Sequence, residues 1–143
     1  MIKDILPPDE ALAQVIDNRV KLETAENFFK PVRCYSDGRR PNTGLDDEFI
    51  EVLENGGVRA RLSNLGAMKG SLLLVVTCKS HPDGTVKKNL IKQMIRQCIN
   101  ISSRRVHSGY IFRVKPDSVV MPTTTNPDTG YSTKAVNVEW RQL

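Results

Sequence analysis

The chain has 143 residues, enough for one domain with a substantial hydrophobic core. Hydrophobic residues make up 39% and charged residues 26%, as in a soluble globular protein, and no apolar run approaches the roughly 20 residues that cross a bilayer, so we expect no membrane partner. Three cysteines at irregular spacing exclude a disulfide framework, and a net charge of +5 permits an acidic partner or nucleic acid without requiring one. The first eight residues lack the apolar segment of an export signal, so we expect synthesis in a cytosol.

A helix is predicted near the N-terminus. Residues 7–10 read Pro-Pro-Asp-Glu, with proline in the first turn and acids near the positive end of the helix dipole. Apolar residues then recur at helical spacing: Leu12, Val15, Ile16 and Val20. Two alternatives stay open, because one helix could continue towards Phe28–Phe29, or Asp17-Asn18 could break it and leave residues 20–22 extended.

Short strands and a long loop are expected next. Residues 32–35 form a short strand, and the polar, turn-rich segment that follows predicts an exposed loop from Tyr35 to Asp47. Residues 49–54 form a strand, residues 55–57 a turn, and residues 58–62 a strand or strand extension.

The centre of the fold is predicted at residues 69–101. Residues 70–78 are an unbroken apolar run without alternation, which indicates a central strand covered on both faces. Residues 80–84 break it, and Asp83 or Thr85 is positioned to cap a helix. The helix has an apolar face and an opposite basic face: Val86, Leu90, Ile91, Met94, Ile95, Cys98 and Ile99 against Lys87, Lys88, Lys92 and Arg96.

The last third predicts a hairpin. Residues 104–109 are a basic connector, residues 110–114 a strand resumed at 119–121, and residues 122–130 a threonine-rich tip. The final strand alternates, with Val136, Val138 and Trp140 inward. The expected fold class is therefore α/β (α+β): one domain over residues 1–143, with a mainly antiparallel sheet, an N-terminal helix and an amphipathic helix packed on it, and a C-terminal β-hairpin.

Candidate chemistry is sparse. Cys78-x-x-His81, with Cys98 and His107 elsewhere, lacks the paired ligands of a zinc site, so buried cysteines and a loop histidine are expected instead. Nucleophile and phosphate-binding motifs are absent from the sequence. An acidic cluster could bind a divalent cation, but a solvated face is the simpler interpretation: Asp46, Asp47, Glu48, Glu51 and Glu54. We therefore expect no enzyme, no metal and no cofactor.

Two charged features are candidate partner-binding surfaces. Lys88, Lys92 and Arg96 are spaced by four on the predicted helix and would form one basic row, which could meet nucleic acid although interleaved aromatic residues are missing. The long loop carries Arg39 and Arg40 at one end and acids at the other: Asp46 and Asp47. A loop this long and polar is usually functional or disordered.

The order of elements resembles the tail-terminator (tail-completion) proteins of long-tailed bacteriophages. The resemblance rests on the N-terminal helical segment, the polar loop at 35–41, the strand at 49–53, the apolar strand and amphipathic helix of residues 71–101, and a last strand that begins Asp128-Thr129-Gly130-Tyr131-Ser132 and alternates to Trp140. A longer first segment and the threonine-rich tip depart from the family pattern.

Membership would imply a virion protein without a cofactor, assembled in the host cytoplasm. It would form a ring, usually a hexamer, that caps the head-proximal end of the tail tube, stops polymerisation and joins the tail to the head connector. Its partners would be itself, the tail tube protein and the connector protein. The alternatives are a basic nucleic-acid-binding domain, another head–tail connector protein and, third, an enzyme.

Overall fold

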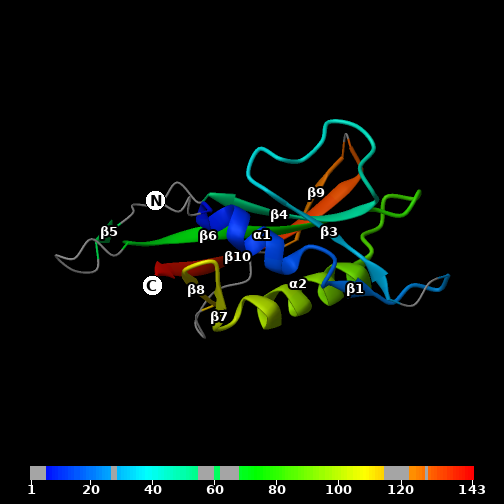
Figure 1. The fold of residues 1–143 in the computed structure, drawn as a ribbon. Coiled ribbons are helices and arrows are strands. Elements are labelled where there is room, and N and C mark those ends of the chain that lie inside the picture. The colour runs from blue at the N-terminus through cyan, green and yellow to red at the C-terminus, as the bar shows by residue number, and fades with distance from the viewer. Residues whose placement is uncertain (1–5, 27–28, 55–59, 62–67, 115–122, 128) are drawn as a thin grey trace.

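A computed structural model describes residues 6–26, 29–54, 60–61, 68–114, 123–127 and 129–143 (Figure 1). Two helices are present in this part of the chain, α1 (Pro8–Ile16) and α2 (Lys88–Ser102). They pack on a sheet whose strands follow the order β3-β4-β6-β10-β8-β7. The strands of the sheet are β3 (Arg33–Ser36), β4 (Glu48–Glu54), β5 (Ala60–Arg61), β6 (Met68–Lys79), β7 (Arg105–His107), β8 (Tyr110–Arg113), β9 (Thr124–Asn126) and β10 (Tyr131–Gln142). The predicted α+β class, with a mainly antiparallel sheet and two helices packed on it, is confirmed.

Two long strands form the middle of the sheet. β6 and β10 pair antiparallel from Tyr131 opposite Lys79 to Arg141 opposite Lys69. The apolar run at residues 70–78 therefore lies in a central strand, as predicted. β10 also pairs with β8, which confirms the predicted C-terminal hairpin, and with β9 within the threonine-rich tip.

Both helices cover the same face of the sheet. α1 contacts β3 and β4, whereas α2 contacts β6 and β10, and the two helices also touch each other. The side chains beneath them alternate along the strands and are buried: Ile50 and Val52 on β4, Leu72, Leu74 and Val76 on β6, and Val136, Val138 and Trp140 on β10. This inner face holds the hydrophobic core.

The opposite, outer face of the sheet differs from the prediction. Leu73 and Val75 of β6 point away from the helices and stay partly exposed, and so does Leu53 of β4. The expectation that both faces of β6 would be covered is therefore wrong. A leucine- and valine-rich run looks the same in sequence whether its second face is fully or partly covered.

The break in the first segment is confirmed. α1 ends at Ile16, and Asn18 adopts a positive φ of 61°, a conformation that asparagine tolerates better than most residues. The chain then forms β1 (Lys21–Leu22), which pairs with β2 (Lys30–Pro31) as a separate two-stranded sheet.

The long polar loop has a structural task. β3 and β4 are adjacent and parallel, so both strands start at the same end of the sheet. Residues 37–47 must therefore return the chain from the end of β3 to the end where β3 began. Figure 1 shows this loop arching away from α2, on the side of the sheet where β9 lies. The helices occupy the inner face, and the loop therefore makes its crossing on the outer side.

Two local predictions are wrong. Asp83 does not cap α2; its carboxylate accepts bonds from the Thr85 amide and hydroxyl at 2.9 and 2.6 Å, and α2 begins later, at Lys88, without a side-chain cap. The basic connector is partly a strand, because β7 and β8 form a tight hairpin through Ser108 and Gly109, both with positive φ. The turn expected at residues 55–57 and the strand at 119–121 lie outside the described residues. None of the described helices is long and apolar enough to span a bilayer.

Candidate functional site

A large hollow lies at the start of α2. It has a volume of about 900 Å³ and opens between the ends of β1 and β4 and the loop that follows β6. Charged residues of both signs dominate its lining: Glu23, Glu26, Lys30, Asp47, Glu48, His81, Lys87 and Lys88.

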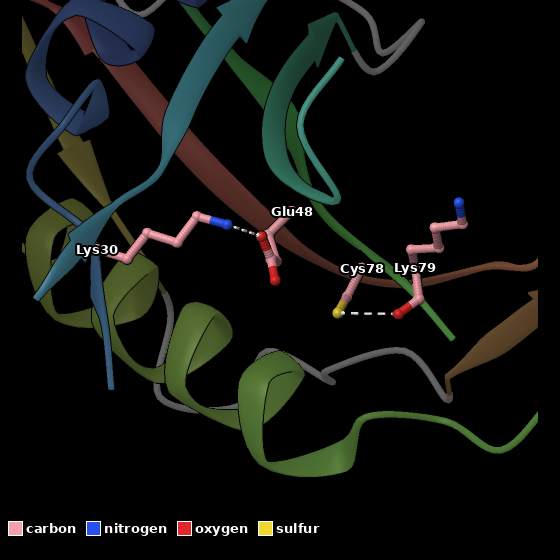
Figure 2. Close-up of polar contacts among 4 residues, drawn as sticks. All are labelled: Lys30, Glu48, Cys78 and Lys79. Atoms are coloured by element: carbon pink, nitrogen blue, oxygen red, sulfur yellow. Dashed lines mark hydrogen bonds and ion pairs between the residues drawn. The ribbon is translucent and has the colours of Figure 1, made fainter. Parts of the chain in front are cut away.

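An ion pair between a buried carboxylate and a partly exposed ammonium lies in its wall (Figure 2). Glu48 occupies the same face of β4 as Ile50 and Val52, so its side chain is turned towards the core and is only 5% exposed. The Lys30 ammonium reaches it from β2, with Nζ donating to Oε2 at 2.7 Å. A buried carboxylate without a partner is strongly unfavourable, and this pair supplies the partner while linking β2 to β4.

The same carboxylate affects both of its neighbours. The hydrogen bond to Glu48 raises the pKa of Lys30, and the charges of Asp46 and Asp47 act in the same direction. Cys78 lies opposite Glu48 in the strand register, and burial, with a smaller effect of the Glu48 charge, raises its thiol pKa to about 11. The thiol is therefore protonated at neutral pH and donates to the Lys79 carbonyl at 3.5 Å, so it is not poised as a nucleophile.

The metal-ligand candidates are not brought together. Cys98 lies on the buried side of α2, and this burial raises the pKa of its thiol. His81 is exposed in the loop after β6. His107 lies on β7, with Nε2 3.4 Å from the Gln14 side chain. Across the described part of the chain, no three histidine, cysteine or acidic side chains gather as a metal site.

The acidic cluster is also divided. Glu48 faces the core, whereas Glu51 lies on the outer face, because successive residues of a strand point to opposite sides. Asp46 and Asp47 are exposed, and Asp47 lines the large hollow. The residues expected to share one solvated face therefore lie in three different environments.

The predicted partner-binding residues fall into separate groups. Asp47 and Lys88 both line the large hollow. Lys92 and Arg96 continue from Lys88 along the exposed side of α2, so the predicted basic row is present and faces solvent. None of these three basic side chains forms a hydrogen bond or ion pair with any described residue.

The two loop arginines contact other residues of the same chain. The Arg39 guanidinium lies 3.3 Å from Glu10 of α1, and the Arg40 guanidinium lies 3.4 Å from Glu51 of β4. Arg40 also sits 5.6 Å above the centre of the Phe49 ring. These contacts tie the loop to the rest of the fold.

A second hollow, of about 500 Å³, lies where the loop meets the outer face. Arg40 and Leu45 of the loop and Thr124 of β9 flank it, and Val75 lies within it. Phe49 and Tyr131 meet edge to face across the sheet, with ring centres 6.1 Å apart. This hollow joins the predicted loop to the partly exposed apolar side chains of the outer face.

Sequence reasoning missed two glutamines with a clear structural role. The Gln97 amide accepts from the Lys21 N–H at 2.8 Å and donates to its carbonyl at 2.7 Å. Gln93, one turn earlier, makes the same two bonds to Glu23 at 2.9 and 3.3 Å. The two side chains bind the backbone of this segment on a side where the described residues place no neighbouring strand. Their spacing of four, between the apolar and basic faces of α2, is the signal that could have indicated it.

Comparison with protein-family models finds no match, and no curated protein matches the sequence. What the chain does is therefore inferred from its surfaces.

Proposed function

We propose that the protein is a structural virion component of the tail-terminator kind. It assembles in the host cytoplasm as a ring of copies, a hexamer by the family resemblance, at the head-proximal end of a phage tail tube. There it ends polymerisation of the tube and joins the tail to the head connector. It acts by binding alone, without catalysis or a cofactor.

The outer face of the sheet is the observation that carries this proposal. Leu53, Leu73 and Val75 lie on it partly exposed, opposite the face that the helices cover. Apolar surface gathered on one side of a small protein is typical of an interaction site. The loop of residues 37–47 adds a polar element beside this surface, in contact with Glu10 and Glu51 through Arg39 and Arg40.

The charged surfaces provide distinct contacts for distinct partners. The row of Lys88, Lys92 and Arg96 faces solvent on the helical side, away from the outer face. A protein that joins a tube to a connector needs at least two such surfaces in addition to the contacts between its own copies. Opposite charges at these contacts fix register and partner choice more than affinity.

Complementation of a phage that lacks its terminator tests the proposal. The wild-type protein should restore infectivity and normal tail length, scored by electron microscopy. A Leu73→Asp/Val75→Asp variant should fail, because two buried carboxylates would disrupt a contact through the outer face. Its thermal melt must first resemble that of the wild type. Absence of the protein from purified tails would contradict the proposal.

A basic nucleic-acid-binding domain is the second candidate. It is favoured by one observation, that Lys88, Lys92 and Arg96 are exposed and unpaired among the described residues. Contacts of these three side chains with phosphates would make affinity fall steeply with salt, with a slope near −0.9 per phosphate contact for duplex DNA. Binding to duplex DNA that is unaffected by Lys92→Asp/Arg96→Asp would rule out this row as a DNA-binding surface.

A further inference from the structure

A group of basic side chains lies at the other end of the outer face. Lys69, Arg113 and Arg141, here called the basic rim, surround a hollow of about 370 Å³. Lys69 and Arg141 are directly opposite each other on β6 and β10. Like charges in that position repel, and neither side chain forms a hydrogen bond or ion pair with the residues that the structure describes.

Among the described residues that line this hollow, one carries a carboxylate. Glu139 lies 3.9 Å from Arg113 and is itself partly exposed. The described part of the lining therefore has a net positive charge of two, from three cations and one anion. Such an arrangement becomes favourable once a partner supplies further carboxylates or phosphates.

Aliphatic side chains adjoin the basic rim and indicate the kind of partner that binds there. Arg141 lies opposite Ile111, which in turn lies opposite Val106, and Val106 is 58% exposed. Leu143, bonded through its amide to Gly109, is 68% exposed. Nucleic-acid bases stack on aromatic side chains, whereas exposed valine and leucine suit an apolar side chain of a protein. The rim fits a protein segment that combines carboxylates with an aliphatic residue.

The chain itself carries a segment of that kind. Leu45, Asp46 and Asp47, here called the acidic loop end, close the loop before β4. Leu45 is partly exposed and both aspartates are exposed. Neither aspartate side chain has a hydrogen bond or ion pair among the described residues.

The two features are too far apart to meet within one copy. The Asp47 carbonyl accepts a bond from the Lys79 amide, at the last residue of β6, whereas Lys69 lies near its first residue. Ten residues of strand separate these positions by roughly 33 Å. Figure 1 shows the loop joining β4 at the end of the sheet opposite to the C-terminus.

We propose that the acidic loop end of one copy docks on the basic rim of the next. Asp46 and Asp47 pair with Lys69, Arg113 and Arg141, while Leu45 packs near Val106 and Leu143. Because two different surfaces meet, the contact is heterologous and propagates head to tail until a ring closes. This inference rests on the proposed ring and names the surfaces that form it.

A charge swap tests the contact. Asp46→Lys/Asp47→Lys makes both surfaces basic, and Lys69→Asp/Arg141→Asp makes both acidic, so each variant alone should repel itself. An equimolar mixture pairs basic loops with acidic rims and acidic loops with basic rims. In sedimentation velocity the wild type and the mixture should associate, and each variant alone should associate at least about tenfold more weakly. Rising salt should weaken the wild-type contact.

Matched controls carry the same charge changes elsewhere. Glu23→Lys/Glu26→Lys and Arg19→Asp/Lys21→Asp alter exposed residues outside both surfaces and should associate like the wild type. Thermal melts establish that all variants fold.

Three results would overturn the inference. Variants that each assemble like the wild type, or a mixture that does not recover, would leave the ring proposal intact and reject this interface. If Lys69→Asp/Arg141→Asp loses binding to labelled duplex DNA while its self-association is unchanged, the rim is a nucleic-acid surface instead. A wild type that stays monomeric both alone and with tail tubes would reject the proposed function as well.

Discussion

Replacing Gln97 by alanine tests how the N-terminal segment is held on the fold. The Gln97 amide makes two bonds to the backbone of Lys21, at 2.8 and 2.7 Å, on a side of β1 where the described part of the chain places no neighbouring strand. Gln97→Ala removes both bonds and leaves an N–H and a carbonyl of β1 without their partners.

The expected loss of stability is modest, and its effect on hydrogen exchange should be confined to the surroundings of β1. A typical hydrogen bond contributes about 0.5–1.5 kcal/mol net, so two contribute about 1–3 kcal/mol. The lower end applies here because water can replace the amide at this exposed position. Alanine also favours the helix by a few tenths of a kcal/mol. The free energy of unfolding should therefore fall by about 1 kcal/mol.

Two measurements check this prediction. Urea unfolding followed by Trp140 fluorescence gives the free energy, and hydrogen exchange of the Lys21 amide gives the local effect. Asn100→Ala, at an exposed position on the same helix, is the control; it should leave the exchange of the Lys21 amide unchanged and raise the free energy of unfolding by a few tenths of a kcal/mol through helix propensity alone. If Lys21 exchanges at the same rate in Gln97→Ala as in Asn100→Ala, the glutamine does not hold β1.

Three further predictions concern the core and the buried ionisable groups. Gly70→Ala should destabilise the fold by about 1–3 kcal/mol and shift Trp140 fluorescence, because a Cβ would lie 2.7 Å from the indole ring; an unchanged melt and spectrum would refute this packing. Burial raises the pKa of Asp9, so its ionised form opposes folding at neutral pH, and this penalty fades as pH falls through the raised pKa. Asp9→Asn keeps an oxygen that accepts from the Asp37 amide. The variant should therefore be more stable than the wild type at pH 7, and the difference in stability should shrink on acidification. The thiol pKa of Cys78 is about 11, so a thiol reagent at pH 8 should modify it only after unfolding; rapid modification of the folded protein would show that the residue is accessible.

Periodicity predicted the core well, because burial follows it directly. The apolar residues at helical spacing in residues 88–102 and the alternation up to Trp140 each identified the side that packs inward. The break at Asp17-Asn18 was foreseen as an alternative, since short polar residues tolerate the left-handed conformation that Asn18 adopts.

Features that depend on distant segments could not be predicted in the same way. β3 pairs parallel with β4, which makes the polar loop a crossover connection. The pattern of apolar and polar residues in either strand does not indicate this pairing. The burial of Glu48 depends on Lys30 arriving from another strand. Asp83 or Thr85 was expected to cap α2 because both precede a helical pattern, but the Asp83 carboxylate accepts from the Thr85 amide and hydroxyl, and α2 begins without a side-chain cap.

Negative-stain electron microscopy of the purified protein mixed with tail tubes tests the central claim most directly. The account predicts closed rings of uniform diameter, seated at one end of each tube, with tubes that no longer elongate when tube protein is added. Tubes that remain bare at both ends and continue to grow in the presence of excess protein would contradict it.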